Sequence, residues 1–534
     1  MPLDTDWFCS RLVQDGDARI ALDPLTGLNS YGCGCRPDSS LLEYGSATAS
    51  TVSAPGFAAA QALATRMAPW INQPFHQQRP HLQALTGQTC ERLLPCLWGT
   101  ADSSDPPCAP PILLLSASGT DALRQGAALC AIPGTRLAIF LLEAEESGRG
   151  VPRALATRVG SAVHHIPARD GAGQPYPVAM VDQALEEAVT RARQAGEQVL
   201  LVLTDVSKTG LISPSPSCIM HLQQRFGSAL QVLVDACQLR LTRTTLRAYL
   251  AQGCLVALTG SKFMGGPSFS GALLLPARHT LPPEPLEQAL QQHILAPGPL
   301  LRWTAALTDL EAFTRIPESL TYSFLAHFAQ HIQRFMAQHP RLEPLPVRQP
   351  DRSALFAAAR AHRPALGATL PEGDAQRLPP QTPPLWDQVQ TIFPFLLHRT
   401  PPSSDHSSLL GPAEMLHLFH QLPKNTRPSA GDVPWAANAP ASFPRGRLGQ
   451  PVRCGARAGR EISALRLCSS ARLVLQSVIG ESWENAGAAK SEHLLFEAGK
   501  DRWPDASRVQ LAADRSAQQA CQFLEHVLWQ SAKC

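Results

Sequence analysis

The chain contains only six lysines, and one of them follows a run of apolar residues. Lys262 lies after the apolar residues 255–258 and before a glycine-rich turn, in the sequence LVALTGSKFMGGP. A lysine amine that is desolvated at the end of a strand is a better nucleophile towards an aldehyde. The alternative is an ordinary lysine whose amine extends to solvent. Lys208, in the sequence LTDVSKTG, is the only rival for the nucleophilic role.

A carboxylate and a group of small residues follow two other apolar runs. Asp235 comes after residues 230–234, so we expect it half-buried at the carboxyl end of a strand, where it needs a cationic or hydrogen-bonding partner. Ser118, Gly119 and Thr120 come after residues 112–115 and before a helix, whose N-terminus suits a phosphate. Alone, the carboxylate is equally a helix cap or an internal ion pair, and the small residues an ordinary N-cap.

Together these three strand ends supply what pyridoxal 5′-phosphate (PLP) requires. The phosphate needs a helix N-terminus, the pyridine nitrogen needs an acid partner that keeps it protonated, and the aldehyde needs a lysine for a Schiff base. The lysine follows the carboxylate by 27 residues. The combination therefore predicts PLP as the cofactor.

The elements that position these residues are predicted from a regular sequence pattern between residues 110 and 276. Short apolar runs alternate with amphipathic helical patterns, which is typical of a mainly parallel sheet covered on both faces. In such sheets ligands bind at the carboxyl ends of the strands. We expect strands at 112–115, 137–142, 199–203, 230–234, 255–258 and 272–275, and helices at 181–196, 245–253 and 323–338.

The chain divides into three predicted parts. Residues 1–110 form an N-terminal segment with an active-site entry, and residues 111–315 form the large cofactor-binding domain. Residues 316–534 form a small C-terminal domain, with a Pro/Ser-rich insertion at about 364–450 and a terminal helix.

The composition excludes several classes of protein. The 534 residues are 44% hydrophobic and 17% charged, a globular balance, and the net charge of +3 gives no reason to expect nucleic acid as a partner. Fourteen cysteines lack metal-ligand spacing, so we expect no metal site and reduced thiols. The start of the chain is not a secretory signal, and no apolar run is long enough to span a membrane. We therefore expect a soluble cytoplasmic protein without a membrane partner.

The three motifs resemble those of a known family. Residues 118–120 (SGT), 234–238 (VDACQ) and 259–267 (TGSKFMGGP) are similar to motifs of the fold type I PLP-dependent enzymes, in particular the class V aminotransferase and cysteine desulfurase-like group. The resemblance covers about residues 110–310. It implies an α/β fold with a mainly parallel, seven-stranded sheet, helices on both faces and a smaller C-terminal α+β domain. It also implies a homodimer with the active site at the subunit interface.

The resemblance also implies roles for individual residues. Lys262 and Asp235 are the catalytic pair, as Schiff-base lysine and partner of the pyridine nitrogen. Gln238 and Ser207 contact the ring oxygen, and Arg466 grips the substrate carboxylate through two parallel hydrogen bonds unless it is a surface arginine. The cofactor-binding residues are Ser118, Gly119, Thr120, Ser207, Asp235, Gln238, Ser261 and Lys262.

Two departures from the family pattern stand out. The family stacks a histidine or another ring on the cofactor shortly after the strand at 137–142, but this chain has Glu145, Glu146 and Ser147 there. A cysteine desulfurase carries its nucleophile on a loop well after the lysine, but this chain has no cysteine between Cys254 and Cys454. The second departure disfavours desulfuration.

The expected function is that of a PLP-dependent enzyme acting on the amino group of a small amino-acid-like or amine substrate. A class V aminotransferase is the simplest form. A PLP-dependent lyase or decarboxylase is the alternative among enzymes, because the shared residues do not decide which bond is broken. A catalytically silent PLP-fold binding protein is the alternative outside enzymes.

Overall fold

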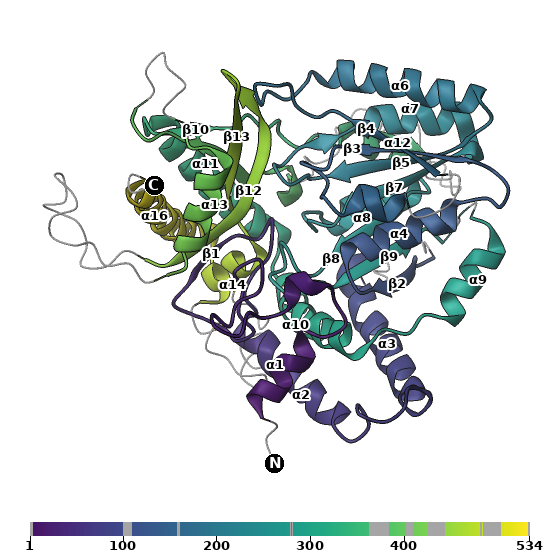
Figure 1. Cartoon of the computed structure of the whole chain (residues 1–534), viewed down its shortest axis with the longest axis horizontal. Coiled ribbons are helices and arrows are strands. Elements are labelled where there is room, and N and C mark those ends of the chain that lie inside the picture. The colour runs from purple at the N-terminus through teal and green to yellow at the C-terminus, as the bar shows by residue number, and fades with distance from the viewer. Residues whose placement is uncertain are drawn as a thin grey trace, which may run out of the picture.

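The computed structural model describes residues 4–99, 109–156, 161–277, 279, 281–361, 384–401, 409–424, 444–480, 483 and 503–531. Two β-sheets lie side by side, each with its own layer of helices (Figure 1). The helices are α1 (Thr5–Leu12), α2 (Ala54–Met67), α3 (Phe75–Trp98), α4 (Gly119–Cys130), α5 (Val151–Leu155), α6 (Val178–Gln194), α7 (Pro216–Phe226), α8 (Arg243–Ala251), α9 (Pro283–Gln291), α10 (Pro297–Phe313), α11 (Glu318–Gln338), α12 (Ser353–Ala361), α13 (Pro412–Gln421), α14 (Ala471–Ile479) and α16 (Ala506–Ser531).

The larger sheet has the strand order β2-β9-β8-β7-β5-β3-β4, with the short β6 paired to β5. Neighbours are parallel except at β9 and β6, which run antiparallel to their partners. The strands are β2 (Ile112–Ser116), β3 (Leu137–Leu142), β4 (Ser161–Ile166), β5 (Gln198–Asp205), β6 (Ile212–Ser213), β7 (Leu230–Ala236), β8 (Leu255–Thr259) and β9 (Gly271–Leu275). All six predicted strands are present, and the expected mainly parallel sheet is confirmed.

Helices cover both faces of this sheet, which explains the continuous apolar runs. Every residue of β3, β5, β7, β8 and β9 is buried. Successive residues of one strand enter different cores: Leu200 and Val202 pack with α4, whereas Leu201 and Leu203 pack in the core of the opposite face. A strand with two buried faces cannot alternate polar and apolar residues.

The smaller sheet has the order β1-β12-β13-β11-β10, and α11 and α13 pack on its strands. Its strands are β1 (Leu42–Tyr44), β10 (Leu342–Pro344), β11 (Ile392–Leu397), β12 (Gly446–Arg457) and β13 (Arg460–Cys468). The strand β1 pairs in parallel with β12, so the N-terminal segment joins this sheet. A segment of three residues is too short for its sequence pattern to predict a strand.

The range 364–450 contains regular structure as well as loops. The strand β11 lies between β13 and β10, and α13 packs on β12 and β13. Residues 362–383, 402–408 and 425–443 lie outside the described residues. The predicted boundaries 1–110, 111–315 and 316–534 stay a prediction.

The expectation of reduced thiols is wrong for one pair. Cys9 of α1 and Cys35 form a disulfide, 26 residues apart in sequence. Within the described parts of the chain, no helix is long and apolar enough to cross a membrane.

A buried ion pair joins the large sheet to the segment that leads into α12. The guanidinium of Arg352 donates to the carboxylate of Asp205 at the end of β5, with 2.8 Å between Nε and Oδ2, and neither side chain is exposed. Tyr249 donates a third hydrogen bond to this carboxylate, at 2.6 Å. Removing one partner of such a pair leaves an uncompensated charge in the interior.

The substitution Arg352→Ala therefore lowers the free energy of unfolding by about 3–5 kcal/mol, because Asp205 stays buried without its cation. Urea unfolding followed by circular dichroism measures the change. The matched control is Arg360→Ala, since Arg360 is exposed on α12 and its loss leaves the unfolding midpoint near that of the wild type. Equal midpoints for both variants would contradict the assignment of the ion pair as a stabilising contact.

Candidate active site

The three sequence motifs meet at the first turn of α4. A Cβ on Gly119 would lie 2.7 Å from Sγ of Cys237 and 2.7 Å from Cγ2 of Thr259, so only glycine lets the motifs approach this closely. The hydroxyl of Thr259 donates to the carbonyl of Cys237 at 2.7 Å, and the N–H of Phe263 donates to the carbonyl of Gln238 at 3.3 Å. The structure thus brings together the three groups that the sequence predicted to share a site.

The start of α4 offers backbone donors. Ser118 is the N-cap, and its hydroxyl accepts from the N–H of Asp121 at 3.1 Å. Gly119 and Thr120 follow in the first turn, where N–H groups have no acceptor within the helix. Ser261 is buried beside Thr259, with 3.4 Å between their hydroxyl oxygens. These groups suit an anion such as a phosphate.

Asp235 is a buried carboxylate for which the described residues supply no cation. It lies at the end of β7, level with Thr204 of β5 and Ala257 of β8, and is 5% exposed. It accepts a hydrogen bond from the N–H of Cys237 at 3.2 Å, and among the described residues it forms no ion pair. Since an unpaired buried carboxylate is costly, a cationic group of a ligand fits this position.

Gln238 is buried beside Asp235 and contacts the N-terminal segment. Its Nε2 donates to the carbonyl of Ala47 at 3.2 Å, while its Oε1 accepts no hydrogen bond from the described residues. The side chain therefore has hydrogen-bonding capacity left for a ligand. Ala47 belongs to the segment that the sequence predicts as the active-site entry, so that segment reaches the site.

A buried carboxylate takes the place where the family carries a stacking ring. Glu146 is 2% exposed and pairs with Arg169, with 2.9 Å between Oε1 and Nε. Ser207 donates to its Oε2 at 2.6 Å and Thr209 to its Oε1 at 2.7 Å. The hydroxyl of Ser207 is thereby engaged by Glu146, and its predicted contact to a ring oxygen stays a prediction.

The sequence did not predict this network, although Glu146 and Ser207 were both noted in it. The signal was a glutamate pair directly after a strand of six buried residues, followed on the neighbouring strand by a loop with a serine and a threonine. The network ties the loop after β3 to the loop after β5, and thus fixes two walls of the site.

Arg466 is a buried arginine and not a surface one. It is 2% exposed on β13, and its guanidinium donates to Oγ1 of Thr48 at 2.7 Å, to the carbonyl of Gln450 and to the carbonyl of Lys208 at 3.1 Å. These contacts bring β13, the entry segment and the loop after β5 together. The role of Arg466 in binding a substrate carboxylate stays a prediction.

The thiols near the site are buried and protonated. Burial, with the nearby charge of Asp235, raises the pKa of Cys237 well above its usual value. Burial raises the pKa of Cys454 to about 12 and also raises that of Cys468. Since the thiolate is the nucleophile, none of these three cysteines is suited to attack a substrate.

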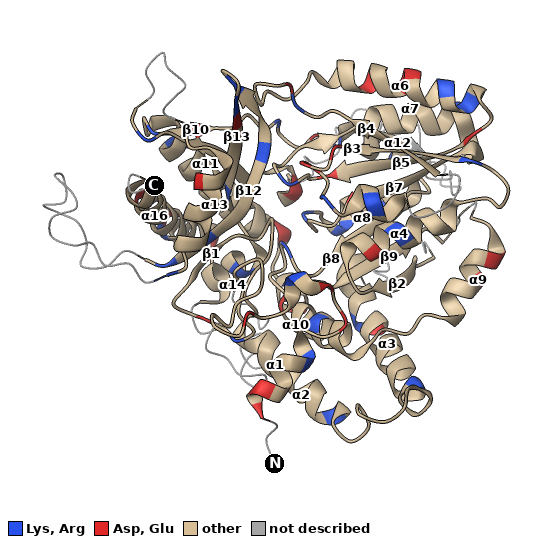
Figure 2. Ribbon diagram, viewed as in Figure 1, with Lys and Arg blue, Asp and Glu red and all other residues tan. Residues whose placement is uncertain are grey.

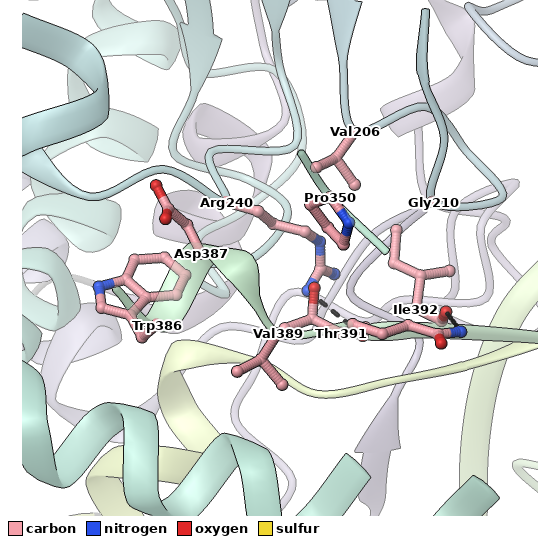
Figure 3. A pocket seen from close by; sticks show the side chains of 10 residues that line it. Val206, Gly210, Arg240, Pro350, Trp386, Asp387, Val389, Thr391 and Ile392 are labelled. Carbon is pink, nitrogen blue, oxygen red and sulfur yellow. Dashed lines mark hydrogen bonds between the residues drawn. The ribbon is translucent and has the colours of Figure 1, made fainter. Parts of the chain in front are cut away.

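A narrow pocket lies next to the site, between the ends of the large sheet and residues 386–392 (Figure 3). Arg240 points into it and donates to Oγ of Ser46 at 2.9 Å and to the carbonyls of Ser469 and Thr391 at 3.1 and 3.4 Å. Its guanidinium also lies 5.0 Å from the ring centre of Phe263, the residue after Lys262. Arg240 therefore holds the entry segment and the smaller sheet against the lysine loop.

Comparisons with known proteins give fold-level likenesses. No family model and no curated protein matches the chain. Similar solved structures are the glutamate decarboxylase domain of a diaminobutyrate-pyruvate transaminase and L-2,4-diaminobutyrate decarboxylase from Vibrio parahaemolyticus (11% identity, 96% of this chain and 90% of that chain, TM-score 0.47) and a cysteine desulfurase from Escherichia coli (12%, 90% and 95%, TM-score 0.43). A third is the TDC protein of Oryza sativa, solved with PLP (11%, 87% and 84%, TM-score 0.44). Identities and TM-scores this low carry no argument about the reaction.

The fold agrees with the one that the resemblance implied: a mainly parallel sheet of seven strands in line, with the short β6 paired to β5 and helices on both faces, and a smaller α+β part. The residues present also fit the cofactor. Within the part of the chain that the structure describes, Asp235 has no cationic partner and Oε1 of Gln238 accepts no hydrogen bond, while the first turn of α4 is packed directly against both motifs. Lys262, half-buried after β8, completes the set.

The close approach at Gly119 gives a stability prediction. Gly119→Ala places a methyl group against Cys237 and Thr259, so the motifs must move apart, at a cost of about 1–3 kcal/mol of unfolding free energy. Thermal unfolding measures the loss. The control is Gly87→Ala on α3, where no atom lies within 4 Å of the added Cβ, and the helix gains about 0.5–1 kcal/mol. A gain at both positions would contradict the tight packing of the three motifs.

Proposed function

We propose that this chain is a PLP-dependent enzyme acting on the amino group of an amino-acid-like substrate, by transamination of the class V type. The observation that supports it most is the buried carboxylate of Asp235, which has no cationic partner among the described residues and lies at the same sheet edge as Lys262 and the start of α4. A protonated pyridine nitrogen supplies the missing positive charge.

Each residue at this edge has a defined part. Lys262 would hold the cofactor through its amine, and the same amine would act as the general base for the proton at the substrate Cα. Asp235 keeps the pyridine nitrogen protonated. The N–H groups of Gly119 and Thr120 and the hydroxyl of Ser261 bind the phosphate. When bound, the cofactor acts as an electron sink for the bonds at Cα.

Transamination requires fewer additional catalytic residues than desulfuration. It would need one general base for the proton at the substrate Cα, and Lys262 is the residue for that role. Desulfuration would need a thiolate, and burial keeps the pKa of Cys454 and Cys237 high. The proposal includes a homodimer and a cytoplasmic location. Light scattering on the purified protein tests the homodimer.

The purified protein, after addition of PLP, is expected to show a visible absorbance band that borohydride bleaches. Peptide mapping is then expected to find a pyridoxyl group on Lys262, and Lys262→Ala to remove the band. The control is Lys424→Ala, since Lys424 is exposed at the end of α13 and far in sequence from the motifs. A protein that stays colourless with added PLP would leave only the silent scaffold and overturn the proposed function.

The carboxylate gives a separate prediction. Asp235→Asn removes the charge that faces the pyridine nitrogen, which costs about 2–5 kcal/mol of cofactor binding. Equilibrium dialysis against PLP measures the affinity. The reaction type is read by mass spectrometry of the products formed from an amino acid and a 2-oxo acid: an exchanged amino group supports transamination, and released carbon dioxide instead supports the decarboxylase alternative. Unchanged PLP affinity in Asp235→Asn would contradict the assigned role.

A further inference from the structure

The residue after Lys262 is fixed in the interior by two aromatic rings and a cation. Phe263 is fully buried, and its ring stacks on Trp386, with 5.2 Å between the ring centres. Phe313 meets the same ring edge to face at 5.6 Å, with 85° between the ring planes. The guanidinium of Arg240 lies over the ring of Phe263, 5.0 Å from its centre. The side chain next to the lysine therefore has little freedom to move.

The backbone at this position is fixed as well. The carbonyl of Lys262 accepts a hydrogen bond from the N–H of Gly265 at 2.9 Å. The N–H of Phe263 donates to the carbonyl of Gln238 at 3.3 Å, so the peptide group that joins the lysine to Phe263 is bonded at both ends. The carbonyl of Phe263 accepts from the N–H of Ala471, the first residue of α14, at 2.8 Å. These bonds fix the point from which the lysine amine extends.

Arg240 places a buried charge against this cluster. Charged residues occur in the loops between the two sheets as well as on outer helices such as α6 (Figure 2). Arg240 is 2% exposed in that interior, and within the part of the chain that the structure describes it forms no ion pair with a carboxylate. A desolvated guanidinium is attracted by the negative face of an aromatic ring. The ring of Phe263 is therefore a partner for the charge of Arg240.

The other contacts of Arg240 reach the segments that surround the candidate site. Its guanidinium donates to the hydroxyl of Ser46 in the entry segment, to the carbonyl of Ser469 after β13 and to the carbonyl of Thr391 before β11. One side chain thus ties the loop of Lys262 to the entry segment and to the smaller sheet. Loss of this side chain releases all three contacts together with the one to Phe263.

We propose that Arg240 is a positioning residue, which acts through Phe263 to hold Lys262 where its amine can attack the aldehyde of PLP. The inference rests on the proposed function, because it uses the role proposed there for Lys262. In that step the amine nitrogen bonds to the aldehyde carbon, a C=N bond replaces the C=O bond, and both hydrogens of the neutral amine leave with the oxygen as water. The alternative is an arginine that only stabilises the fold.

The test compares two ligands that differ in one group. PLP can bond to Lys262, whereas pyridoxamine 5′-phosphate carries an amine in place of the aldehyde and cannot. Bond formation with PLP is followed by stopped-flow absorbance and by mass spectrometry of the borohydride-reduced protein. The affinity for pyridoxamine 5′-phosphate is measured by equilibrium dialysis. A residue that positions the lysine affects the first measurement, and a residue that only stabilises the fold affects both alike.

Arg240→Met is expected to slow bond formation with PLP about 10-fold to 100-fold, since a displacement of about 1 Å at a reacting group costs on the order of 100-fold. Its affinity for pyridoxamine 5′-phosphate is expected to stay near that of the wild type. Arg240→Lys keeps a cation near the ring and is expected to react faster than Arg240→Met. Equal losses with both ligands in Arg240→Met, or an unchanged rate with PLP, would overturn the inference.

The matched control is Arg247→Met. Arg247 also places its guanidinium over an aromatic ring, that of Trp98, at 5.4 Å from the ring centre, but it lies on α8 and contacts the end of α3. This variant loses the same kind of contact away from the lysine loop and is expected to keep the wild-type rate with PLP. An equal slowing in Arg247→Met would show a general effect of losing a buried guanidinium and would count against Arg240.

A double-mutant cycle tests whether Arg240 acts through Phe263. Phe263→Leu removes the ring and is expected to slow bond formation with PLP as Arg240→Met does. Since residues in contact give non-additive effects, the double variant is expected to be no slower than the slower of the two single variants. Effects that multiply in the double variant would contradict an action through this contact.

A measurement on the wild-type protein keeps the inference testable where a variant does not fold. Before PLP is added, the N–H groups of Phe263 and Ala471 are expected to exchange slowly with deuterium, because both are hydrogen-bonded in the interior. Exchange at both positions as fast as in an unstructured peptide would show that the lysine loop is not held, and would overturn the inference.

The two proposals fail in different ways. A protein that stays colourless with PLP overturns the proposed function and this inference with it. A coloured protein in which Arg240→Met affects both ligands equally overturns the inference alone and leaves the proposed function standing.

Discussion

The charge of Asp235 is the constraint on which the site depends. Its carboxylate lies buried at the end of β7 with one backbone hydrogen bond and, among the described residues, no cation. A protein seldom keeps such a charge unless a ligand compensates it. The start of α4 lies close to the motifs that carry Asp235 and Lys262, because Gly119 lets α4 pack directly on Cys237 and Thr259.

A second carboxylate determines the opposite wall. Glu146 forms a buried network with Ser207, Thr209 and Arg169, and thereby joins two neighbouring loops. The N–H of Lys208 also donates to the carbonyl of Glu146, so the network extends along the loop after β5. The candidate site thus combines Asp235, Lys262 and the start of α4 with a wall built around Glu146.

The large sheet and its three motifs were predictable from the sequence, because strands buried on both faces must be continuously apolar and their polar ends are then easy to see. What the sequence did not reveal are contacts between distant segments. The pairing of β1 with β12, the disulfide of Cys9 with Cys35 and the ion pair of Asp205 with Arg352 each join residues whose separation carries no periodic signal. The same holds for Glu146, whose partners become clear only once β3 and β5 are neighbours.

A crystal structure of the protein grown with PLP tests the central claim most directly. The account predicts electron density continuous with Nζ of Lys262, a pyridine nitrogen within hydrogen-bonding distance of Asp235, and a phosphate at the N–H groups of Gly119 and Thr120. Cofactor density elsewhere in the molecule, or a site filled by protein side chains with Asp235 paired to one of them, would contradict it.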